Sequence, residues 1–322
     1  MTAQKRNQAM TARFRLLLAP VLIALLVAGC EKAEGLYSAK KKIAEVYTTR
    51  TGTYMSQNEE TGAWEDVDYA EPRYKSEEWT WERSKLYSIK YTLRDGYSAG
   101  TDAFSYDGAL LVEKHNRDNS SETVFSYLGK ELQTIEFYLD GSLYSSTFLK
   151  HKDGKIVDAT THFYSMKKHL DPRCLEGALL FAPYTAYRLA NSKDAPPDAV
   201  QEELLSERIA IEWVGDNITA VTSYYDGKAQ GWWSYTYDDK KNPMRNFWAK
   251  SELSCVSVPL YGSENNLLTA KMVYVGETLE TYSYSYDYQG SDYPATCTCT
   301  MQKKQGNYYP VKETTVTEYV YK

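Results

Sequence analysis

Short runs in which apolar or aromatic residues alternate with polar ones fill most of the chain after residue 84. Alternation with a period of two is typical of β-strands that bury one face. Asp-Gly and similar pairs separate many runs and supply the positive φ of a tight hairpin turn. The pattern predicts antiparallel strands at residues 86–93, 103–106, 110–115, 123–127, 132–139, 143–150, 156–164, 209–214, 218–225, 232–237, 268–275, 278–286, 295–302 and 311–321.

Several of these strand-and-turn units resemble one another. The sequence FSYDGAL at residues 104–110 returns as FSYLGKEL at residues 125–132, and variants of the unit occur at residues 137–143, 153–156 and 224–227. Repetition of a hairpin unit indicates that neighbouring units share one continuous sheet. We therefore expect a mainly β fold: a large antiparallel meander, either an open sheet or a closed barrel.

A segment of different character interrupts the strands at about residues 170–208. Its apolar part, residues 175–189, contains Pro183, and Pro196-Pro197 precede a stretch with helical spacing at residues 198–208. Proline at a helix start and acidic residues in the first turn favour a helix there. The pattern predicts a short helical insert that caps one face or end of the sheet.

The first thirty residues have the layout of a bacterial secretory signal. A basic opening is followed by an uncharged, mostly apolar run at residues 16–29, and small residues stand directly before Cys30. The run is short for a transmembrane helix and contains Pro20. We expect residues 1–29 to be the signal, Cys30 to carry lipid, residues 30–42 to be a polar tether and residues 43–322 to form the tyrosine-rich β domain. Secretion without lipidation remains the alternative.

The end of the signal, Val27-Ala28-Gly29-Cys30, resembles the lipobox of bacterial lipoproteins. The resemblance implies a membrane anchor through Cys30. Because Glu31 rather than aspartate follows the cysteine, it also implies the outer membrane of a Gram-negative envelope, facing either the periplasm or the cell surface.

Charge excludes one class of partner. The formal net charge is −6, and the predicted signal contains basic residues but no acidic ones, so the mature chain is more acidic still. Nucleic-acid binding needs phosphate-neutralising basic patches, so no nucleic-acid partner is expected. The 30 tyrosines suit a pleated, half-buried sheet surface or an aromatic ligand platform.

Four cysteines lie in the predicted β domain: Cys174, Cys255, Cys297 and Cys299. An exported compartment permits disulfides, and four cysteines allow three pairings. The two cysteines at 297 and 299 share one face of an extended strand, so each could meet Cys174 or Cys255 but not easily the other. One or two disulfides and buried thiols both remain open.

Two kinds of motif carry a family resemblance. The Tyr-x-Tyr-Asp and Asp-Gly-x-Leu/Ile units are similar to YD repeats, and residues 235–243 (YTYDDKKNP) and 282–287 (YSYSYD) resemble uncharacterised Bacteroidetes lipoproteins with a porin-like β fold. The regular Gly-Arg-Leu step of YD-repeat shells is missing. The resemblance covers about residues 84–322 and implies a β architecture and an envelope location, but no catalytic residue.

Chemistry-bearing motifs are scarce. There is no nucleophile elbow, P-loop or dinucleotide fingerprint, and the histidines at 115, 151, 162 and 169 show no HxH or HExxH spacing. We therefore predict no metal site, no cofactor and no enzymatic activity. A glycoside hydrolase needs only two suitably spaced carboxylates, so that class stays as a secondary alternative.

Aromatic ladders are the better functional candidates. Alternating positions place their rings on one face of a strand, where they could stack on sugar rings or stabilise the sheet through cross-strand pairs. The candidate platform comprises Trp232, Trp233, Tyr235, Tyr237, Tyr282, Tyr284 and Tyr286.

Two non-enzymatic functions follow from these features. The first is an outer-membrane lipoprotein that acts as a binding module, with a glycan as the candidate ligand. The second is a structural or assembly lipoprotein whose strand edges pair with another envelope protein.

Overall fold

The computed structural model describes residues 37, 41–58, 60–164, 176–186, 205–250, 256–274, 277–303 and 310–322. The predicted signal, Cys30, Cys174, Cys255 and most of the 170–208 insert lie outside the described residues. No helix among the described residues is long and apolar enough to cross a membrane.

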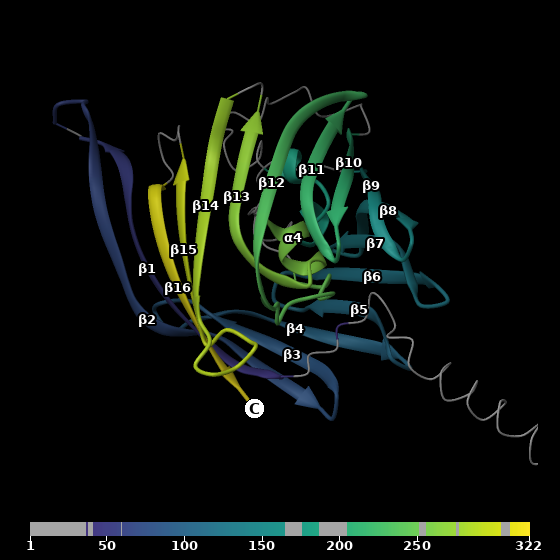
Figure 1. The fold of residues 1–322 in the computed structure, drawn as a ribbon. Helices are drawn as coiled ribbons and strands as arrows, with labels where there is room; N and C mark the ends of the chain where they lie inside the picture. Colours follow the sequence, from purple (N-terminus) through teal and green to yellow (C-terminus); the bar gives the residue numbers. More distant parts are fainter. Residues whose placement is uncertain are drawn as a thin grey trace, which may run out of the picture. The chain divides into compact units, whose positions relative to one another are not determined.

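Sixteen antiparallel strands follow one another around a closed barrel, each paired with its neighbour in sequence (Figure 1). The meander predicted from the sequence is therefore confirmed, and β1 closes it by pairing with β16. The strands are β1 (Ile43–Gln57), β2 (Trp64–Glu82), β3 (Lys85–Thr92), β4 (Ser98–Asp107), β5 (Leu110–Asn116), β6 (Ser121–Leu128), β7 (Glu131–Leu139), β8 (Ser142–Lys152), β9 (Lys155–Phe163), β10 (Leu205–Val214), β11 (Asn217–Tyr225), β12 (Lys228–Lys241), β13 (Asn265–Tyr274), β14 (Glu277–Asp287), β15 (Thr296–Lys303) and β16 (Pro310–Tyr321).

The Asp-Gly pairs form the hairpin turns that the sequence predicted. Both residues have positive φ at Asp140-Gly141 (50° and 71°), Asp153-Gly154 (53° and 73°) and Asp226-Gly227 (50° and 70°). Two consecutive positive φ angles define the type I′ turn, whose twist matches that of the flanking strands.

Alternation along the strands separates a lumen face from an outer face. In β4 and β6 the repeated phenylalanines, Phe104 and Phe125, point inward and are buried. The outer face is rich in charge: Arg73 pairs with Glu318 at 2.8 Å, and Lys75 with Glu45 at 3.2 Å.

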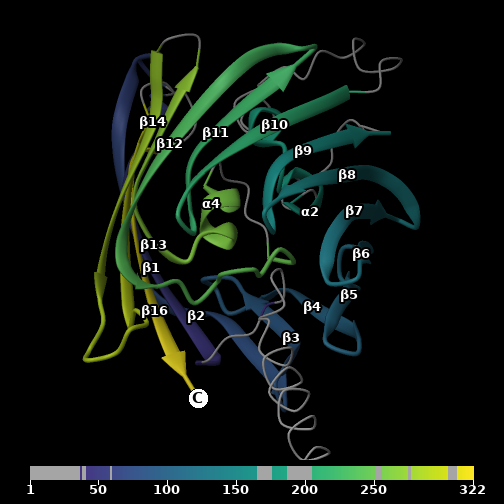
Figure 2. The same ribbon diagram turned by 45° about the vertical axis from the view of Figure 1, so that its right-hand side comes forward.

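Two connections fold into the lumen between the strands (Figure 2). The β9–β10 connection contributes α2 (Glu176–Leu179), which packs against β7 and β8, and the β12–β13 connection contributes α4 (Ser257–Gly262), which packs against β11 and β13. Both approaches depend on glycine, because a Cβ on Gly177 would lie 2.8 Å from the Phe137 ring and one on Gly262 would lie 2.5 Å from Ile218.

The structure corrects two predictions and adds two strands. Residues 205–208, the end of the predicted 198–208 helix, belong to β10, because they pair with β9 from Leu205↔Phe163 onward. The described part of the insert, residues 176–186, is largely buried inside the barrel. The sequence pattern predicted neither β1 nor β2.

An aromatic cluster closes one end of the lumen. Phe247, from the β12–β13 connection, lies 5.5 Å from Trp79 and 5.7 Å from Phe104 between ring centroids. Tyr37 stacks on Phe247 at 4.3 Å, which places this part of the predicted tether inside the barrel. We call this aromatic end, where the β12–β13 connection enters, the floor of the lumen.

Candidate functional site

A cavity of about 920 Å³ occupies the lumen above the floor. Its size falls in the range of small-molecule sites. Strand lengths shape it, because β1, β2 and β12 have 15, 19 and 14 residues whereas β3, β5 and β6 have only 8, 7 and 8. The cavity extends to the β3–β4 and β5–β6 loops, where Leu93 is exposed. This low side of the wall is the mouth of the cavity.

Tyrosines line one wall of the cavity. Tyr282, Tyr284 and Tyr286 project from β14 into the lumen and are half-buried, so part of each ring faces the cavity. The rings of Tyr284 and Tyr286 lie nearly parallel, 8° apart, with centroids separated by 6.5 Å. Burial raises the pKa of both hydroxyls far above the ordinary value, with a smaller contribution from neighbouring cysteines. Both side chains therefore stay protonated at neutral pH.

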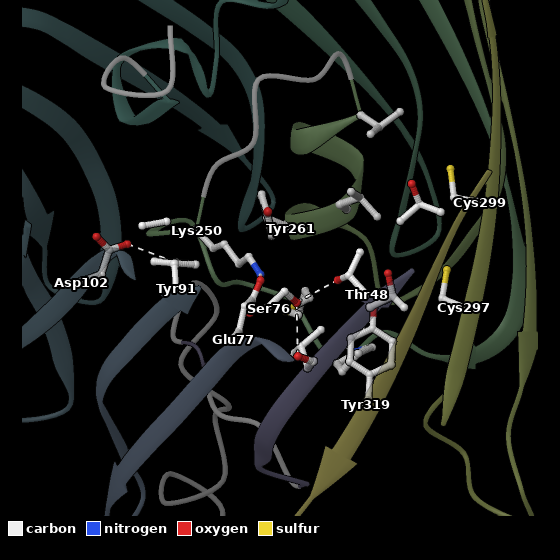
Figure 3. A pocket seen from close by; sticks show the side chains of 18 of the residues that line it. Thr48, Ser76, Glu77, Tyr91, Asp102, Lys250, Tyr261, Cys297, Cys299 and Tyr319 are labelled. Atoms are coloured by element: carbon white, nitrogen blue, oxygen red, sulfur yellow. Dashed lines mark hydrogen bonds and ion pairs between the residues drawn. The ribbon is translucent and has the colours of Figure 1, made fainter. Parts of the chain in front are cut away.

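The cysteines of β15 lie beside this ladder, on the strand that pairs with β14. Cys299 pairs in register with Tyr284 and Cys297 with Tyr286, and both cysteines line the cavity (Figure 3). The prediction that they share one strand face is confirmed. Because Cys174 and Cys255 lie outside the described residues, the pairing of the four cysteines stays a prediction.

Three of the four basic side chains of the cavity lining contact carboxylates. Lys250 contacts Glu77 at 2.5 Å, and Lys114 contacts Asp102 at 3.8 Å. Figure 3 labels Lys250, Glu77 and Asp102. A third pair joins Lys303 to Glu280 at 2.9 Å. Acidic and basic side chains are equal in number along the lining: Arg50, Lys114, Lys250 and Lys303 against Glu77, Asp102, Asp118 and Glu313.

Hydroxyl and amide groups complete the polar lining. The Tyr91 hydroxyl donates to Asp102 at 3.2 Å, and the Asn116 amide donates to the same carboxylate at 2.9 Å. On the adjoining strands β1 and β2 the Ser76 hydroxyl donates to the Val46 carbonyl. The Thr48 hydroxyl is therefore the donor in its 2.8 Å contact with Ser76 (Figure 3). The cavity thus offers many neutral polar groups around paired charges.

The residues of the predicted platform divide between the two faces of the barrel. Trp232 points outward and is 42% exposed, whereas Trp233 is completely buried and Tyr235 is 5% exposed. Tyr237 is half-buried, and its hydroxyl donates to the Ile218 carbonyl. Of the predicted residues, only the three β14 tyrosines line the cavity.

Sequence reasoning missed the charged pairs of the cavity. Lys250 and Glu77 are 173 positions apart, and the pattern around them gives no sign that they meet. Asp102 and Lys114 belong to adjacent strands, but only the register of β4 on β5 places them together.

Solved structures that resemble this chain include two porin-like proteins. One, from Bacteroides uniformis ATCC 8492, gives a TM-score of 0.47 at 10% sequence identity and covers 87% of this chain and 96% of its own. Another, from Bacteroides vulgatus ATCC 8482, gives 0.25 at 10% identity, with coverage of 88% and 99%. No protein-family model and no curated protein matches the chain.

The fold assignment rests on the strand pairing of this chain itself. The closed barrel confirms the β architecture that the sequence resemblance implied. The lipid anchor and the kinship with YD repeats stay predictions.

Proposed function

We propose that this chain is an envelope lipoprotein whose barrel binds a neutral, polyhydroxylated ligand, a saccharide, in its lumen. The observation that carries the proposal is the Tyr282–Tyr284–Tyr286 ladder, half-buried along a cavity of about 920 Å³. A saccharide offers apolar ring faces to aromatic side chains and hydroxyl groups to polar ones. Both kinds of partner line this cavity.

The pairing of charges supports a neutral ligand. An ionic ligand would be expected to meet a surplus of the opposite charge, but the acidic and basic groups of the lining are balanced and three of the cations contact carboxylates. Hydrogen bonds to charged groups are about twice as strong as neutral ones. Ligand hydroxyls could therefore bind these groups without a change in net charge.

The outer face supports a barrel surrounded by water and held by its anchor. An arginine or lysine side chain that faces lipid costs about 2–4 kcal/mol at the bilayer midplane, and an acidic one costs less. The outer face carries several charged pairs, among them Arg73–Glu318 and Lys75–Glu45. The lipid on Cys30 would then provide the attachment to the membrane.

Docking of Tyr37 on the floor gives the tethered barrel an orientation. Cys30 and Tyr37 are seven positions apart, and a chain of that length spans at most about 25 Å. The floor would therefore face the membrane, and the mouth, at the opposite ends of the strands, would face away from it.

A glycan array probed with protein that begins at residue 31 tests the proposal. We expect binding to neutral glycans, and calorimetry with the best oligosaccharide should give a Kd that rises about 30-fold in Tyr284→Ala, because an aromatic anchor contributes about 2 kcal/mol. Tyr284→Phe retains the ring and should bind nearly as well as the original protein. Tyr138→Ala, on the outer face, is the matched control.

Binding that is equal in Tyr284→Ala and Tyr138→Ala would exclude the cavity as the site. Binding only to acidic glycans would contradict the argument from charge balance. No binding to any glycan would remove the saccharide proposal altogether.

One strand edge favours the assembly role as a second candidate. β2 pairs with β3 only from Glu77 to Glu82, so its segment from Trp64 to Ser76 has β1 on one side and no described strand on the other (Figure 1). Such an edge can accept an added strand from a partner, although Pro72 and Arg73 are of the kinds that natural edges use to limit pairing. Recovery of an envelope protein by crosslinking through residues 64–76, and its loss on Val67→Pro, would support this role.

A further inference from the structure

A second group of convergent side chains lies on the outer wall, away from the cavity. Glu113 and His115 are two positions apart on β5 and therefore share a face, and Glu122 of β6 lies directly opposite His115. One imidazole nitrogen and one oxygen from each carboxylate all lie within 4.8 Å of one another. We propose that these three residues form a binding site for a divalent transition-metal ion, with Zn²⁺ as the best match.

The ligand set decides the class of metal. Imidazole and carboxylate together suit Zn²⁺ and its first-row neighbours, whereas Ca²⁺ and Mg²⁺ prefer an all-oxygen shell. Two donors on one tetrahedral Zn²⁺ lie about 3.4 Å apart. Small rotations of the three half-buried side chains, without movement of the strands, would shorten the present spacing to that value.

The sheet holds the three donors in place. The β5–β6 turn is fixed by its asparagines: Asn116 accepts backbone N–H bonds from Asp118 at 3.0 Å and Asn119 at 3.4 Å, and Asn119 accepts one from Ser121 at 3.1 Å. These bonds fix the register that puts His115 opposite Glu122. A site on paired strands is more precisely held than one on a loop.

The surroundings leave the two carboxylates uncompensated. On the flanking strands, Glu113 lies opposite Ser105 of β4 and His115 opposite Ala103. Glu122 lies opposite Tyr138 of β7, and none of these neighbours carries a positive charge. Within the described part of the chain, no hydrogen bond or ion pair joins Glu113, His115 or Glu122 to another group. Like charges that lie close on a sheet face are destabilising, and a bound divalent cation would relieve that repulsion.

A titration of the purified full-length protein with Zn²⁺ in detergent, measured by calorimetry, tests the site. We expect one Zn²⁺ per chain, little heat with Ca²⁺, and a rise in Tm on adding Zn²⁺. His115→Ala and Glu122→Gln should each weaken binding by about tenfold or more, since even outer-shell partners of a metal contribute 10- to 100-fold. His162→Ala and Glu212→Gln change the same residue types elsewhere on the outer wall and should leave binding intact.

Co²⁺ as a spectroscopic probe separates this site from the cysteines. Ligation by nitrogen and oxygen gives d–d bands without a thiolate-to-cobalt charge-transfer band. The four substituted residues all face outward, so near-UV spectra that match those of the original protein would show that the variants are folded. The proposal fails if Zn²⁺ does not bind saturably, if His115→Ala binds as tightly as His162→Ala, or if Co²⁺ shows the thiolate band.

Discussion

At the scale of single residues, the lumen is held together by buried charges that meet specific partners. Glu207 of β10 is completely buried, and its carboxylate accepts hydrogen bonds from the backbone N–H groups of Tyr184 at 2.9 Å and Thr185 at 2.8 Å and from the Ser223 hydroxyl at 2.6 Å. This one side chain therefore fixes residues 184–185 of the β9–β10 connection against the barrel wall. Burial raises the pKa of Glu207 above its ordinary value, and the hydrogen bonds oppose the shift.

Replacement of Glu207 should be costly, and the cost should depend on pH. Glu207→Ala leaves three buried donors without an acceptor, and we expect a loss of about 3 kcal/mol or more in the free energy of unfolding. Because the pKa of Glu207 is raised in the folded state, its contribution is complete below the unfolded-state pKa and is lost as pH rises through the folded-state pKa. The difference in stability between the original protein and Glu207→Ala should thus be larger at pH 5 than at pH 8.

Chemical denaturation of both proteins at the two pH values measures this difference. Comparison with Glu207→Ala removes the contributions of surface carboxylates that titrate in the same range, such as Glu45 and Glu318, whose pKa values are lowered by hydrogen bonds from Tyr47 and Arg73 respectively. A difference that grows with pH would contradict the assigned direction of the Glu207 shift.

At the scale of elements, the floor depends on how the β12–β13 connection is fastened to the wall. The Asn242 side chain donates to the Leu260 and Ser263 carbonyls at 2.5 and 3.0 Å, which holds the connection to α4. Lys250 then joins the connection to Glu77 of β2, which also accepts a hydrogen bond from the Trp79 indole at 2.7 Å. The floor is thus attached to the barrel by a buried ion pair.

Breaking that pair on one side should loosen the floor. Lys250→Met leaves the Glu77 carboxylate buried without its cation, and we expect a loss of about 3–5 kcal/mol in unfolding free energy. The double variant with Glu77→Gln removes both charges and keeps an acceptor for the Trp79 indole, so it should be less destabilised than the single variant. Denaturation of the three proteins measures the effect, and equal losses in the single and double variants would show that the ion pair does not hold the floor.

The sequence predicted the elements wherever alternation and turn chemistry agreed. The Asp-Gly turns and the strands from residue 86 onward followed from local pattern, because a period of two and a positive-φ pair act within a few residues. The sequence pattern did not predict β1 and β2, because charged and polar residues occupy both faces of these strands toward the far end of the hairpin, as in residues 64–71. The helix prediction at 198–208 was wrong for residues 205–208, which belong to β10. The helical spacing of the leucines gives no sign that β9 is available as a partner strand.

At the scale of the whole molecule, closure of the sheet was not predictable from local pattern. A meander looks the same in sequence whether it stays open or closes, since the deciding pairing joins β1 to β16 across most of the chain. The cavity was hidden for the same reason, because its lining comes from strands at both ends of the sequence. Only the tyrosine ladder of β14 was recognisable beforehand, as three alternating rings in one strand.

The membrane attachment is a property of the intact chain and has a direct test. If Cys30 carries lipid, Cys30→Ser should move the protein from the membrane fraction to the soluble fraction and abolish labelling by a fatty-acid analogue. The charged outer face predicts that the released barrel stays soluble without detergent. Continued membrane fractionation and labelling of Cys30→Ser would overturn the anchor assignment.

The pairing of β1 with β16 also sets the order in which the molecule can be completed. The Lys322 N–H donates to the Lys42 carbonyl at 2.8 Å, so the residue that follows β16 is bonded to the residue that precedes β1. Hairpins such as β6–β7 can form as soon as their own residues are available, but β1 keeps an open edge until β16 has been made. The ring therefore closes only after β16 has been made, and until then the growing sheet presents an unpaired strand to any neighbour.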